Sequence, residues 1–289
     1  MKPSSFEYVR PETLGDAISA LAAAQGDGKI IAGGQSLMPM LNFRLLAPSI
    51  LVDISRLKEL DYLEENNGGL RIGALTRHHS LESSPLVKRL FPVLADAMSN
   101  VAHLAIRNRG TIGGSITHAD PAAELPLMMM LLDAKISLRS PRGMRHVDAR
   151  DFFVGTLSTD VEEDEIVTEI NLPALPESSS WAFEEVSRRA GDFALAAVGV
   201  VLNLSRGVVE HVRIAVGGMD EKPLRLHGAE SLLEGRKLDD AALDDVIRSI
   251  KADVNPTTDL HASAEYRMHL VGTLARRALL VAAGRSKGE

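Results

Sequence analysis

The chain has 289 residues, of which 45% are hydrophobic and 25% are charged, and its formal net charge is −7. This is a globular composition, and the length exceeds what one compact core usually supports, so we expect two domains. The acidic balance argues against a nucleic-acid-binding protein. No apolar run approaches the roughly 20 residues that span a bilayer, and residues 1–10 lack a signal-peptide pattern, which together predict a cytoplasmic protein without a membrane span.

The absence of cysteine restricts the chemistry of the chain. It excludes disulfides, thiol nucleophiles and thiolate-ligated Fe–S clusters within this chain. The histidines do not predict a metal site either, because His78 and His79 are adjacent and no H-E-x-x-H motif occurs. We therefore expect surface or loop roles for His78, His79 and His103. Hydrolase, kinase and β-lactamase motifs are also missing, so no catalytic residue is assigned.

A pair of glycines ends the first predicted strand. A helix is expected over residues 14–22, with Thr13 and Asp16 as a capping box, and strands are expected over 29–32 and 50–54. Residues up to about 56 then form a β-α-β-type unit, in which 38–41 is too short to classify. Gly33-Gly34 and the following Ser36 predict a nest of backbone amides that suits an anion. An ordinary Gly-Gly turn is the alternative.

A second glycine loop repeats this pattern. Thr111-Ile112-Gly113-Gly114-Ser115 again places two glycines between an apolar residue and a serine. Neither copy is a P-loop or a Rossmann motif, because the required lysine or glycine spacing is missing. The backbone amides of Gly33–Ser36 and of Thr111–Ser115, with the hydroxyls of Ser36, Thr111 and Ser115, are expected to hold one diphosphate between them.

The middle of the chain alternates helices with hairpins. Asp120-Pro121 is expected to start a helix, with Asp120 as its cap, and Met128–Met130 are expected to fill a core rather than to bind metal. Helices are predicted at 80–90, 91–102 and 125–132, hairpins at 61–73 and 135–147, and a further strand at 166–170.

The Pro- and Ser-rich segment 173–180 predicts the domain boundary. Beyond it, three strands and then three helices predict a small antiparallel sheet with a helical layer. The strands are expected at 181–187, 195–204 and 208–216, and the helices at 229–233, 241–250 and 264–283.

These motifs, in this order, resemble one family. The segments AGGQSL (32–37) and TIGGS (111–115) resemble the FAD-binding loops of the flavoprotein, or medium, subunits of molybdenum hydroxylases such as carbon monoxide and xanthine dehydrogenases. Further matches are Ala119-Asp120-Pro121 with Glu124, the segment 187–193, and Ala264-Glu265-Tyr266-Arg267. The resemblance extends over nearly the whole chain.

The resemblance implies a fold and a function. It implies an α+β fold with an FAD-binding domain of the p-cresol methylhydroxylase type over 1–176, with subdomains at about 1–56 and 57–176. A C-terminal domain of three-stranded antiparallel sheet plus helices is expected over 177–289. The chain is then an FAD-binding electron-transfer subunit. Electrons reach FAD from [2Fe–2S] clusters on a small partner subunit and pass to an external acceptor, while a large subunit holds the molybdopterin cofactor, in a dimer of heterotrimers.

The resemblance also implies cofactor contacts. The residues expected at FAD are Ile31, Ala32, Gly33, Gly34, Gln35, Ser36, Leu37, Val101, Thr111, Ile112, Gly113, Gly114, Ser115, Asp120, Glu124, Ile166 and Phe193. Glu184-Glu185 stands where relatives often carry a lysine, which removes a cationic contact from that stretch. Phe193 stands where relatives can have a tyrosine near the flavin ring, so it can stack but cannot donate a hydrogen bond.

Several readings stay open at this point. Asp120 can be only a helix cap, Glu124 can be a solvated first-turn carboxylate, and Arg188 and Arg189 can be surface charges. For the whole chain, one alternative is a non-redox regulatory or scaffold module that binds an anionic nucleotide in the same loops. Another is a flavin oxidase or reductase that works alone.

Overall fold

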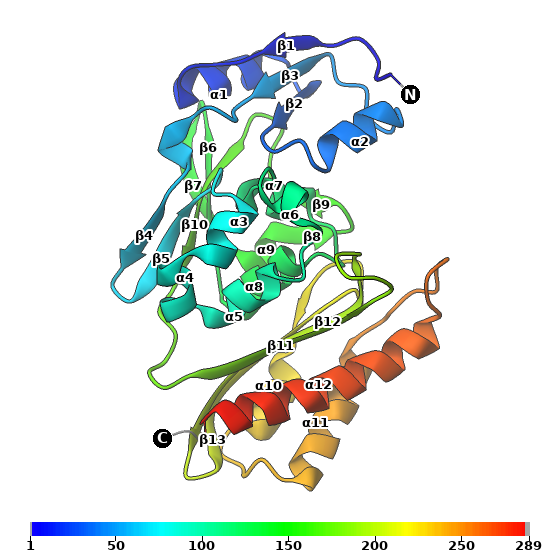
Figure 1. The fold of residues 1–289 in the computed structure, drawn as a ribbon. Helices are drawn as coiled ribbons and strands as arrows, with labels where there is room; N and C mark the ends of the chain where they lie inside the picture. Colours follow the sequence, from blue (N-terminus) through cyan, green and yellow to red (C-terminus); the bar gives the residue numbers. More distant parts are fainter. Residues whose placement is uncertain (1, 287–289) are drawn as a thin grey trace.

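The computed structural model describes residues 2–286, and its three larger sheets form the centres of three units stacked along the molecule (Figure 1). The first unit is a parallel sheet in the order β1-β3-β2, which α1 and α2 accompany. It confirms the predicted β-α-β unit, and β1 adds a strand that the sequence did not predict. The elements are β1 (Glu7–Val9), α1 (Leu14–Ala23), β2 (Gly28–Ile31), α2 (Leu37–Asn42) and β3 (Ile50–Asp53).

Helix α1 begins where its cap was predicted. The Thr13 hydroxyl oxygen accepts a hydrogen bond from the amide of Asp16 at 3.1 Å, which satisfies one of the open amides of the first turn. Ala17 and Leu21 are buried on the side of α1 that packs on the sheet. The apolar spacing of this helix therefore places its core-facing side correctly.

The middle unit is an antiparallel sheet in the order β4-β5-β10-β6-β7, and helices pack against it. Met128, Met129 and Met130 are buried in the shared core, so their predicted packing role is confirmed. The strands are β4 (Leu63–Asn66), β5 (Gly69–Gly73), β6 (Lys135–Ser140), β7 (Gly143–Asp148) and β10 (Ile166–Leu172), with a small hairpin of β8 (Phe153–Gly155) and β9 (Ser158–Thr159). The helices are η1 (Lys58–Leu60), α3 (His78–Ser83), α4 (Pro85–Leu90), α5 (Pro92–Met98), α6 (Leu104–Arg107), α7 (Ile112–His118), α8 (Glu124–Leu131) and α9 (Ala149–Phe152).

Two prolines divide the predicted helix pair in this unit. Pro85 and Pro92 each begin a new short helix, because proline cannot continue the hydrogen bonding of a preceding turn. Ser84 caps α4 through a bond from the amide of Val87 at 3.4 Å. Three short helices therefore stand where two longer ones were predicted.

The predicted helix start at Asp120 is wrong. Helix α8 begins at Glu124 and its N-cap position is Ala123. The Asp120 carboxylate instead accepts a hydrogen bond from the amide of Ala122 at 2.9 Å, which closes a turn two residues on. Asp120 is thus part of a connecting turn, and its side chain stays beside the cavity described below.

The third unit is an antiparallel sheet in the order β11-β12-β13-β14. Three strands were predicted, and the two-residue β14 adds a fourth. The elements are β11 (Ser180–Ser187), β12 (Ala194–Ser205), β13 (Val208–Gly217), β14 (Leu224–Arg225), α10 (His227–Leu233), α11 (Asp240–Asp253) and α12 (Ala264–Ser286). No helix in the described part of the chain is both long and apolar enough to cross a membrane.

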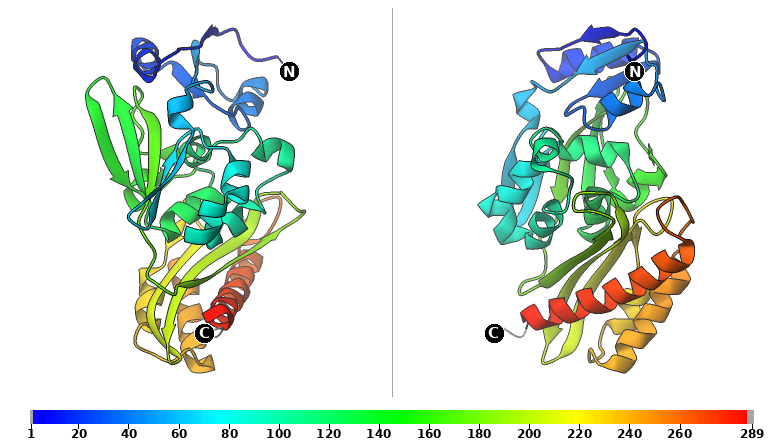
Figure 2. Two further views of the ribbon diagram at one scale, coloured as in Figure 1. Left: turned by 60° about the vertical axis from the view of Figure 1, so that its left-hand side comes forward. Right: turned by 45° about the vertical axis from the view of Figure 1, so that its right-hand side comes forward.

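Strand β12 is buried on both faces. One face packs toward α8 of the middle unit, and α12 covers the other, as the two views of Figure 2 show. Its side chains alternate between the two cores: Ala197 and Val201 join the core of the middle unit, whereas Val198 and Val200 join that of the third unit. Double burial explains why this strand is almost continuously apolar.

Candidate functional site

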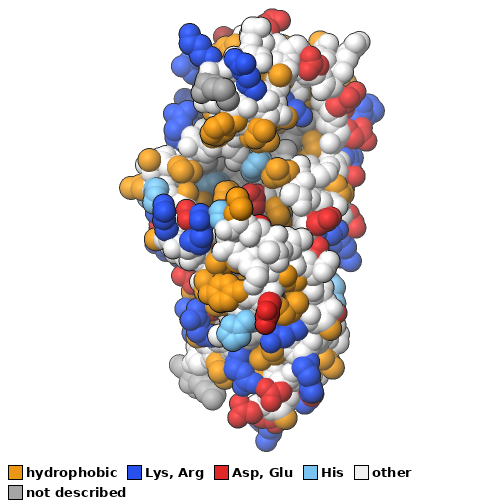
Figure 3. Space-filling view, turned by 90° about the vertical axis from the view of Figure 1, so that its right-hand side faces the viewer, with side chains coloured by type: hydrophobic (Ala, Val, Ile, Leu, Met, Phe, Trp, Pro, Cys, Tyr) orange, Lys and Arg blue, Asp and Glu red, His pale blue; other side chains and the backbone are white. Residues whose placement is uncertain are grey.

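A cavity of about 610 Å³ lies between the first unit and the helical side of the middle unit. Figure 3 shows a hollow in the upper half of one face of the molecule, with hydrophobic and histidine side chains around it. A loop from the third unit, Gly191–Phe193, also contributes to the wall. The cavity is therefore built from all three units, although they are far apart in the sequence.

Most of the residues expected at the cofactor line this cavity, and two do not. Ile31, the last residue of β2, does not line it, although Ile30 and Ala32 on either side do. Ile112 is fully buried in the core of the middle unit. The predicted residues that line the cavity are Ala32, Gly33, Gly34, Gln35, Ser36, Leu37, Val101, Thr111, Gly113, Gly114, Ser115, Asp120, Glu124, Ile166 and Phe193.

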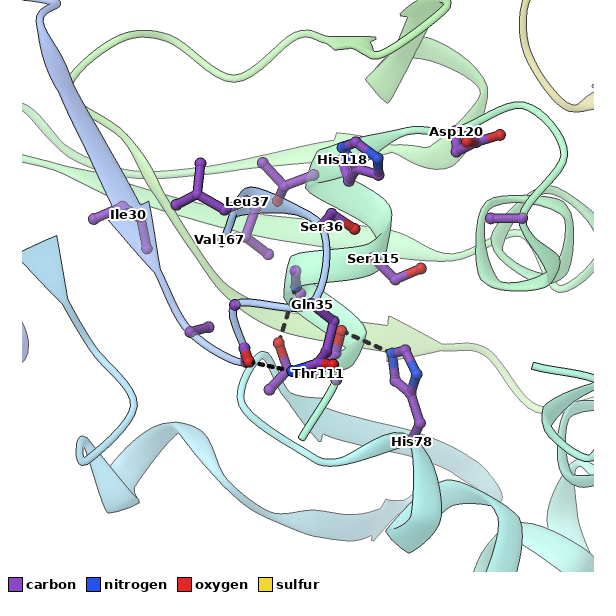
Figure 4. Close-up of a pocket in the computed structure, with 18 of the residues that line it drawn as sticks. Ile30, Gln35, Ser36, Leu37, His78, Thr111, Ser115, His118, Asp120 and Val167 are labelled. Atoms are coloured by element: carbon purple, nitrogen blue, oxygen red, sulfur yellow. Dashed lines mark hydrogen bonds between the residues drawn. The ribbon is translucent and has the colours of Figure 1, made fainter. Parts of the chain in front are cut away.

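The first glycine loop carries a row of open backbone amides. Gly34 has a φ of +72°, a conformation that glycine adopts easily, and the Gln35 side-chain amide donates to the Gly33 carbonyl at 2.9 Å (Figure 4). Within residues 2–286, the amides of Gly33–Leu37 donate to no protein acceptor. Ser36 is the N-cap of α2 and makes no side-chain cap bond. A strand end with unsatisfied amides suits an anionic group.

The second glycine loop is the start of helix α7. Thr111 is its N-cap, and the Thr111 hydroxyl oxygen accepts from the amide of Gly114 at 3.2 Å. The next amides also have protein acceptors: Ile112 donates to the Thr76 carbonyl at 3.0 Å, and Gly113 donates to the Ala74 carbonyl at 2.9 Å. The second loop therefore differs from the open nest that the sequence predicted.

Gly33 of the first loop touches the backbone just before the second loop. A Cβ on Gly33 would lie 2.2 Å from the carbonyl oxygen of Arg109, far inside the distance that real atoms allow. The Arg77 guanidinium donates to this same carbonyl. Gly33 is thus needed where one backbone meets the other, as well as beside the cavity.

His78 supports this junction from below, and its predicted surface or loop role is wrong. It is 6% exposed, and its Nε2 lies 3.0 Å from the Thr111 carbonyl oxygen (Figure 4). Because a carbonyl only accepts, Nε2 carries the proton and Nδ1 is left without a partner among the described residues. Burial lowers the pKa of His78 to about 4, so the ring is neutral.

The far wall comes from the segment 187–193. Gly191 has a φ of +81°, and a Cβ there would lie 2.8 Å from the Ala102 carbonyl oxygen, so this loop rests directly on the backbone of the middle unit. Arg107 fixes that backbone by donating to the carbonyls of Val101 and Ala102 at 2.8 and 2.9 Å. Phe193, 59% exposed, presents its ring at the cavity.

Carboxyl groups gather near this wall. Glu124 is 6% exposed, and burial, followed by the charge of Asp120, raises its pKa to about 7. Burial and then the charge of Glu124 raise the pKa of Glu185 to about 8, and no hydrogen-bond partner for the Glu185 Oε2 occurs in the described residues. Glu184, in contrast, faces away and pairs with Arg277. Glu124, which is buried, and Glu185, which is half-buried, therefore both keep their protons to a higher pH than exposed carboxyl groups do.

The arginines of the far loop are exposed, as the surface-charge alternative expected. Arg188 lies 3.6 Å from the Asp192 carboxylate, four residues on, and neither Arg188 nor Arg189 lines the cavity. Among the described lining residues, Lys29 is the only lysine or arginine. No group of three or more His, Asp or Glu residues within 2–286 could hold a metal ion.

Sequence reasoning missed several residues of the wall. His118 lies one helical turn after Ser115, and Asp192 precedes Phe193, so an extension of the motifs by periodicity and by neighbours would have included both. Leu157, Val161 and Glu165 carry no local signal, because they reach the cavity through the fold of the middle unit. Arg145 holds Glu165 through two bonds of 2.8 and 2.6 Å.

The residues present fit FAD. The volume lies within the range of small-molecule sites, about 300–1,000 Å³. The open amides of Gly33–Leu37 match the charge of a diphosphate, and Gly114 lines the same cavity, where a Cβ would lie only 2.9 Å from the Thr111 hydroxyl oxygen. The apolar side chains of Val101, Ile166 and Phe193 can contact a ring system. When bound, FAD supplies the electron chemistry and the protein supplies binding and orientation.

Comparisons with known proteins agree with this fit. Residues 4–175 match the family described as FAD binding domain in molybdopterin dehydrogenase, and residues 181–282 match the CO dehydrogenase flavoprotein C-terminal domain. The glyceraldehyde dehydrogenase medium chain of Sulfolobus acidocaldarius is 39% identical, over 96% of this chain and 98% of its own. The carbon monoxide dehydrogenase medium chain of Hydrogenophaga pseudoflava is 38% identical, over 96% and 97%.

Solved structures give the same assignment. Carbon monoxide dehydrogenase from Hydrogenophaga pseudoflava superposes with a TM-score of 0.96 at 38% identity, and 99% of each chain is covered. Quinoline 2-oxidoreductase from Pseudomonas putida 86 gives 0.94 at 36% identity, again over 99% of each. The predicted fold, oxidoreductase class and FAD cofactor are confirmed: this chain belongs to the FAD-binding medium subunits of molybdenum hydroxylases.

Proposed function

We propose that this subunit holds FAD with its diphosphate on the first glycine loop. The observation that carries this placement is the run of amides from Gly33 to Leu37, which have no acceptor among residues 2–286. The Ser36 hydroxyl, on the same loop, donates to the diphosphate, and Ser115, on helix α7, lines the same cavity (Figure 4). Because amides are neutral, they bind the anion without requiring a lysine or arginine at the loop.

The flavin ring then lies toward the far wall. Phe193 and Val101 provide apolar contact area there, and Glu124 lines the same cavity, whereas Ile166 lines it beside the core of the first unit. The raised pKa values of Glu124 and of neighbouring Glu185 reduce the negative charge that these two groups carry at neutral pH, which favours an anionic cofactor. Ile31 and Ile112, which were expected at the cofactor but do not line the cavity, support its wall from behind in this proposal. Residues 1–176 and 177–289 form the two domains of this proposal.

The electron route follows from what the chain lacks. Without cysteine it has no thiolate ligand for an Fe–S cluster, so the one-electron carriers belong to a small [2Fe–2S] subunit. When bound, a flavin can exchange electrons in pairs or singly, which suits a position between those clusters and an external acceptor. A large molybdopterin subunit oxidises the substrate, and the whole is a dimer of heterotrimers.

The first experiment measures FAD on the full chain. The protein purified alone should be yellow, or should take up one FAD per chain, and should not oxidise a substrate by itself. A colourless chain that refuses FAD would instead support a nucleotide-binding scaffold. Full substrate turnover by the chain alone would support a self-sufficient flavin enzyme.

The second experiment measures the route in the native complex. The complex is reduced anaerobically with its substrate and followed by rapid-freeze EPR and by flavin absorbance. Fe–S reduction should precede flavin reduction, and removal of this subunit should leave the clusters reduced. Flavin reduction ahead of the clusters would contradict the proposed direction.

A further inference from the structure

The motif Ala264-Glu265-Tyr266-Arg267 has no contact with the cavity, yet its arginine is buried. Arg267 lies in the first turn of α12 and is 7% exposed, which is unusual for an arginine without a structural task. Its Nη1 donates to the Leu195 carbonyl at 2.6 Å and to the Gly218 carbonyl at 3.3 Å. These carbonyls lie at the start of β12 and just beyond the end of β13.

The other side of the guanidinium is anchored as well. Nη2 donates to the Asp259 carboxylate at 2.8 Å. That carboxylate also accepts from the amides of His261 and Ala262, at 2.7 and 2.9 Å, so it is held in place before Arg267 reaches it. The planar fork therefore joins a fixed carboxylate to two backbone carbonyls, a geometry that a lysine cannot reproduce.

The two carbonyls belong to a junction from which both sides of the far wall extend. Leu195 follows Phe193 by two residues, so the first carbonyl fixes the end of the loop that carries Asp192 and Phe193. The Gly218 amide donates to the Pro121 carbonyl at 2.8 Å, and the Ala194 amide donates to the Ala122 carbonyl at 3.3 Å. Pro121 and Ala122 connect Asp120 with Glu124, which line the same cavity.

The junction leaves no room for adjustment. Gly218 has a φ of +70°, and a Cβ on it would lie 3.0 Å from the Ala194 carbonyl oxygen and 3.2 Å from that of Leu195. A shift of Leu195 would thus move Gly218, and through Pro121 it would move the turn that ends at Glu124. The wall residues of two separate units are coupled at one place.

From this geometry we propose that Arg267 is a positioning residue for the cofactor cavity. Through the carbonyls of Leu195 and Gly218 it fixes both the Asp192-Phe193 loop and the Asp120–Glu124 turn against the flavin. This inference rests on the proposed placement of the flavin ring at the far wall. It assigns a task to the arginine of a motif that the cofactor contacts leave unexplained.

The chain provides a matched control on the same helix. Arg285, near the end of α12, also donates to a carbonyl of the same sheet, that of Trp181 at 2.7 Å, and stacks on the Trp181 ring. Trp181 is not among the described residues that line the cavity. Arg285 is exposed, whereas Arg267 is buried, so Arg285→Gln removes an arginine-to-carbonyl bond from α12 without touching the junction.

The experiment compares Arg267→Lys, Asp259→Asn and Arg285→Gln in the full chain. Arg267→Lys should weaken FAD binding by at least about tenfold, since bonds from a charged donor to buried carbonyls are strong ones. It should also change the visible circular dichroism of bound flavin and speed tryptic cleavage after Arg188 and Arg189 several-fold. Asp259→Asn, which leaves both carbonyl bonds in place, should shift each readout the same way by a smaller amount.

Arg285→Gln should lower the melting temperature without altering the flavin spectrum or the cleavage rate. The proposal is overturned if Arg267→Lys changes only the melting temperature, as the control does. If Arg267→Lys does not fold, an Asp259→Asn protein with unchanged flavin spectrum and cleavage rate overturns it as well. Should the unaltered chain fail to bind FAD, the proposed function fails, whereas cleavage of the FAD-free chain still tests Arg267.

Discussion

The two glycine loops share a sequence pattern and differ in how their amides are used. In the first, the amides of Gly33–Leu37 have no acceptor in the described part of the protein, and Ser36 at the start of α2 makes no cap bond there. In the second, Thr111 caps α7 and the amides that follow are satisfied within the protein. The same residue pattern therefore has two roles. The first loop keeps its amides open for an anion, and the second builds the wall against which the first is packed.

The largest expected effect comes from breaking the contact between the loops. Gly33→Val should reduce flavin content by more than tenfold, because its Cβ would collide with the Arg109 carbonyl and force the loops apart. Flavin per chain and far-UV circular dichroism measure this. Gly155→Val is the control, since nothing lies within 4 Å of a Cβ there. Full flavin occupancy in Gly33→Val would refute the junction.

Gly114→Val should act less strongly than Gly33→Val. A Cβ on Gly114 would meet only the Thr111 hydroxyl, at 2.9 Å, so the helix start can adjust while the cavity loses space. We expect weaker FAD binding with a nearly unchanged fold, measured by FAD titration and thermal melting. Equal losses in the two variants would mean that the loops are equivalent after all.

A pH titration separates the neutral first loop from the carboxyl wall. The pKa values of Glu124 and Glu185, about 7 and 8, lie above the ordinary 4.5, so the folded chain binds extra protons. Their stabilising contribution is complete below pH 4.5 and is lost as pH rises toward 8. At pH 8.5 the free energy of unfolding of Glu185→Gln should therefore exceed that of the unaltered chain by roughly 1–3 kcal/mol. Near pH 5 the two values should be equal. Urea unfolding at both pH values measures this difference.

Glu184→Gln is the control for this titration. Glu184 neighbours Glu185 on β11 but pairs with Arg277, so its loss should lower stability slightly at every pH tested. A Glu185→Gln protein whose stability follows that of the unaltered chain at both pH values would show that Glu185 is not a buried acid. At pH 8.5 the FAD affinity of Glu185→Gln should likewise exceed that of the unaltered chain, since deprotonation of Glu185 adds negative charge near an anionic cofactor.

The smallest expected effects come from the two N-cap residues, Thr111 and Ser36. One substitution should change stability and the other should change FAD binding. Thr111→Val should lower stability by about 1 kcal/mol, the usual value of an N-cap bond, with little change in FAD affinity. Ser36→Ala should leave stability unchanged, because Ser36 caps nothing in the protein, and should weaken FAD binding several-fold. Melting and FAD titration on both variants decide this. The reverse pattern would assign the diphosphate to the second loop.

The sequence predicted the helices and strands better than the contacts between them. Thr13, the alternating strands and the methionines were placed correctly, because caps, periodicity and apolar runs are local properties. Asp120 misled because its carboxylate has two local uses, a helix cap and a two-residue turn, and the sequence does not choose between them. The second loop misled because the acceptors of its amides, Thr76 and Ala74, lie 36 and 39 residues earlier in the chain.

The site was predictable where a motif carried it and hidden where packing did. His78 was assigned to a surface or loop because a lone histidine has no pattern, and only the fold shows it buried under Thr111. Leu157 and Glu165 reach the cavity only through the arrangement of the middle unit. Conversely, the sequence identifies Arg267 as part of the last motif, but its role appears only in its contacts with the Leu195 and Gly218 carbonyls.

The double burial of β12 has a consequence for folding. Ala197 and Val201 complete the hydrophobic core of the segment before the linker, so that segment cannot bury its own apolar surface without a strand made later in synthesis. Cutting the chain near residue 176 would expose this surface on both fragments and lead to aggregation rather than to two independent proteins. The segment 173–180 marks a change of composition, but we expect the two parts that it joins to melt together, because they share this core.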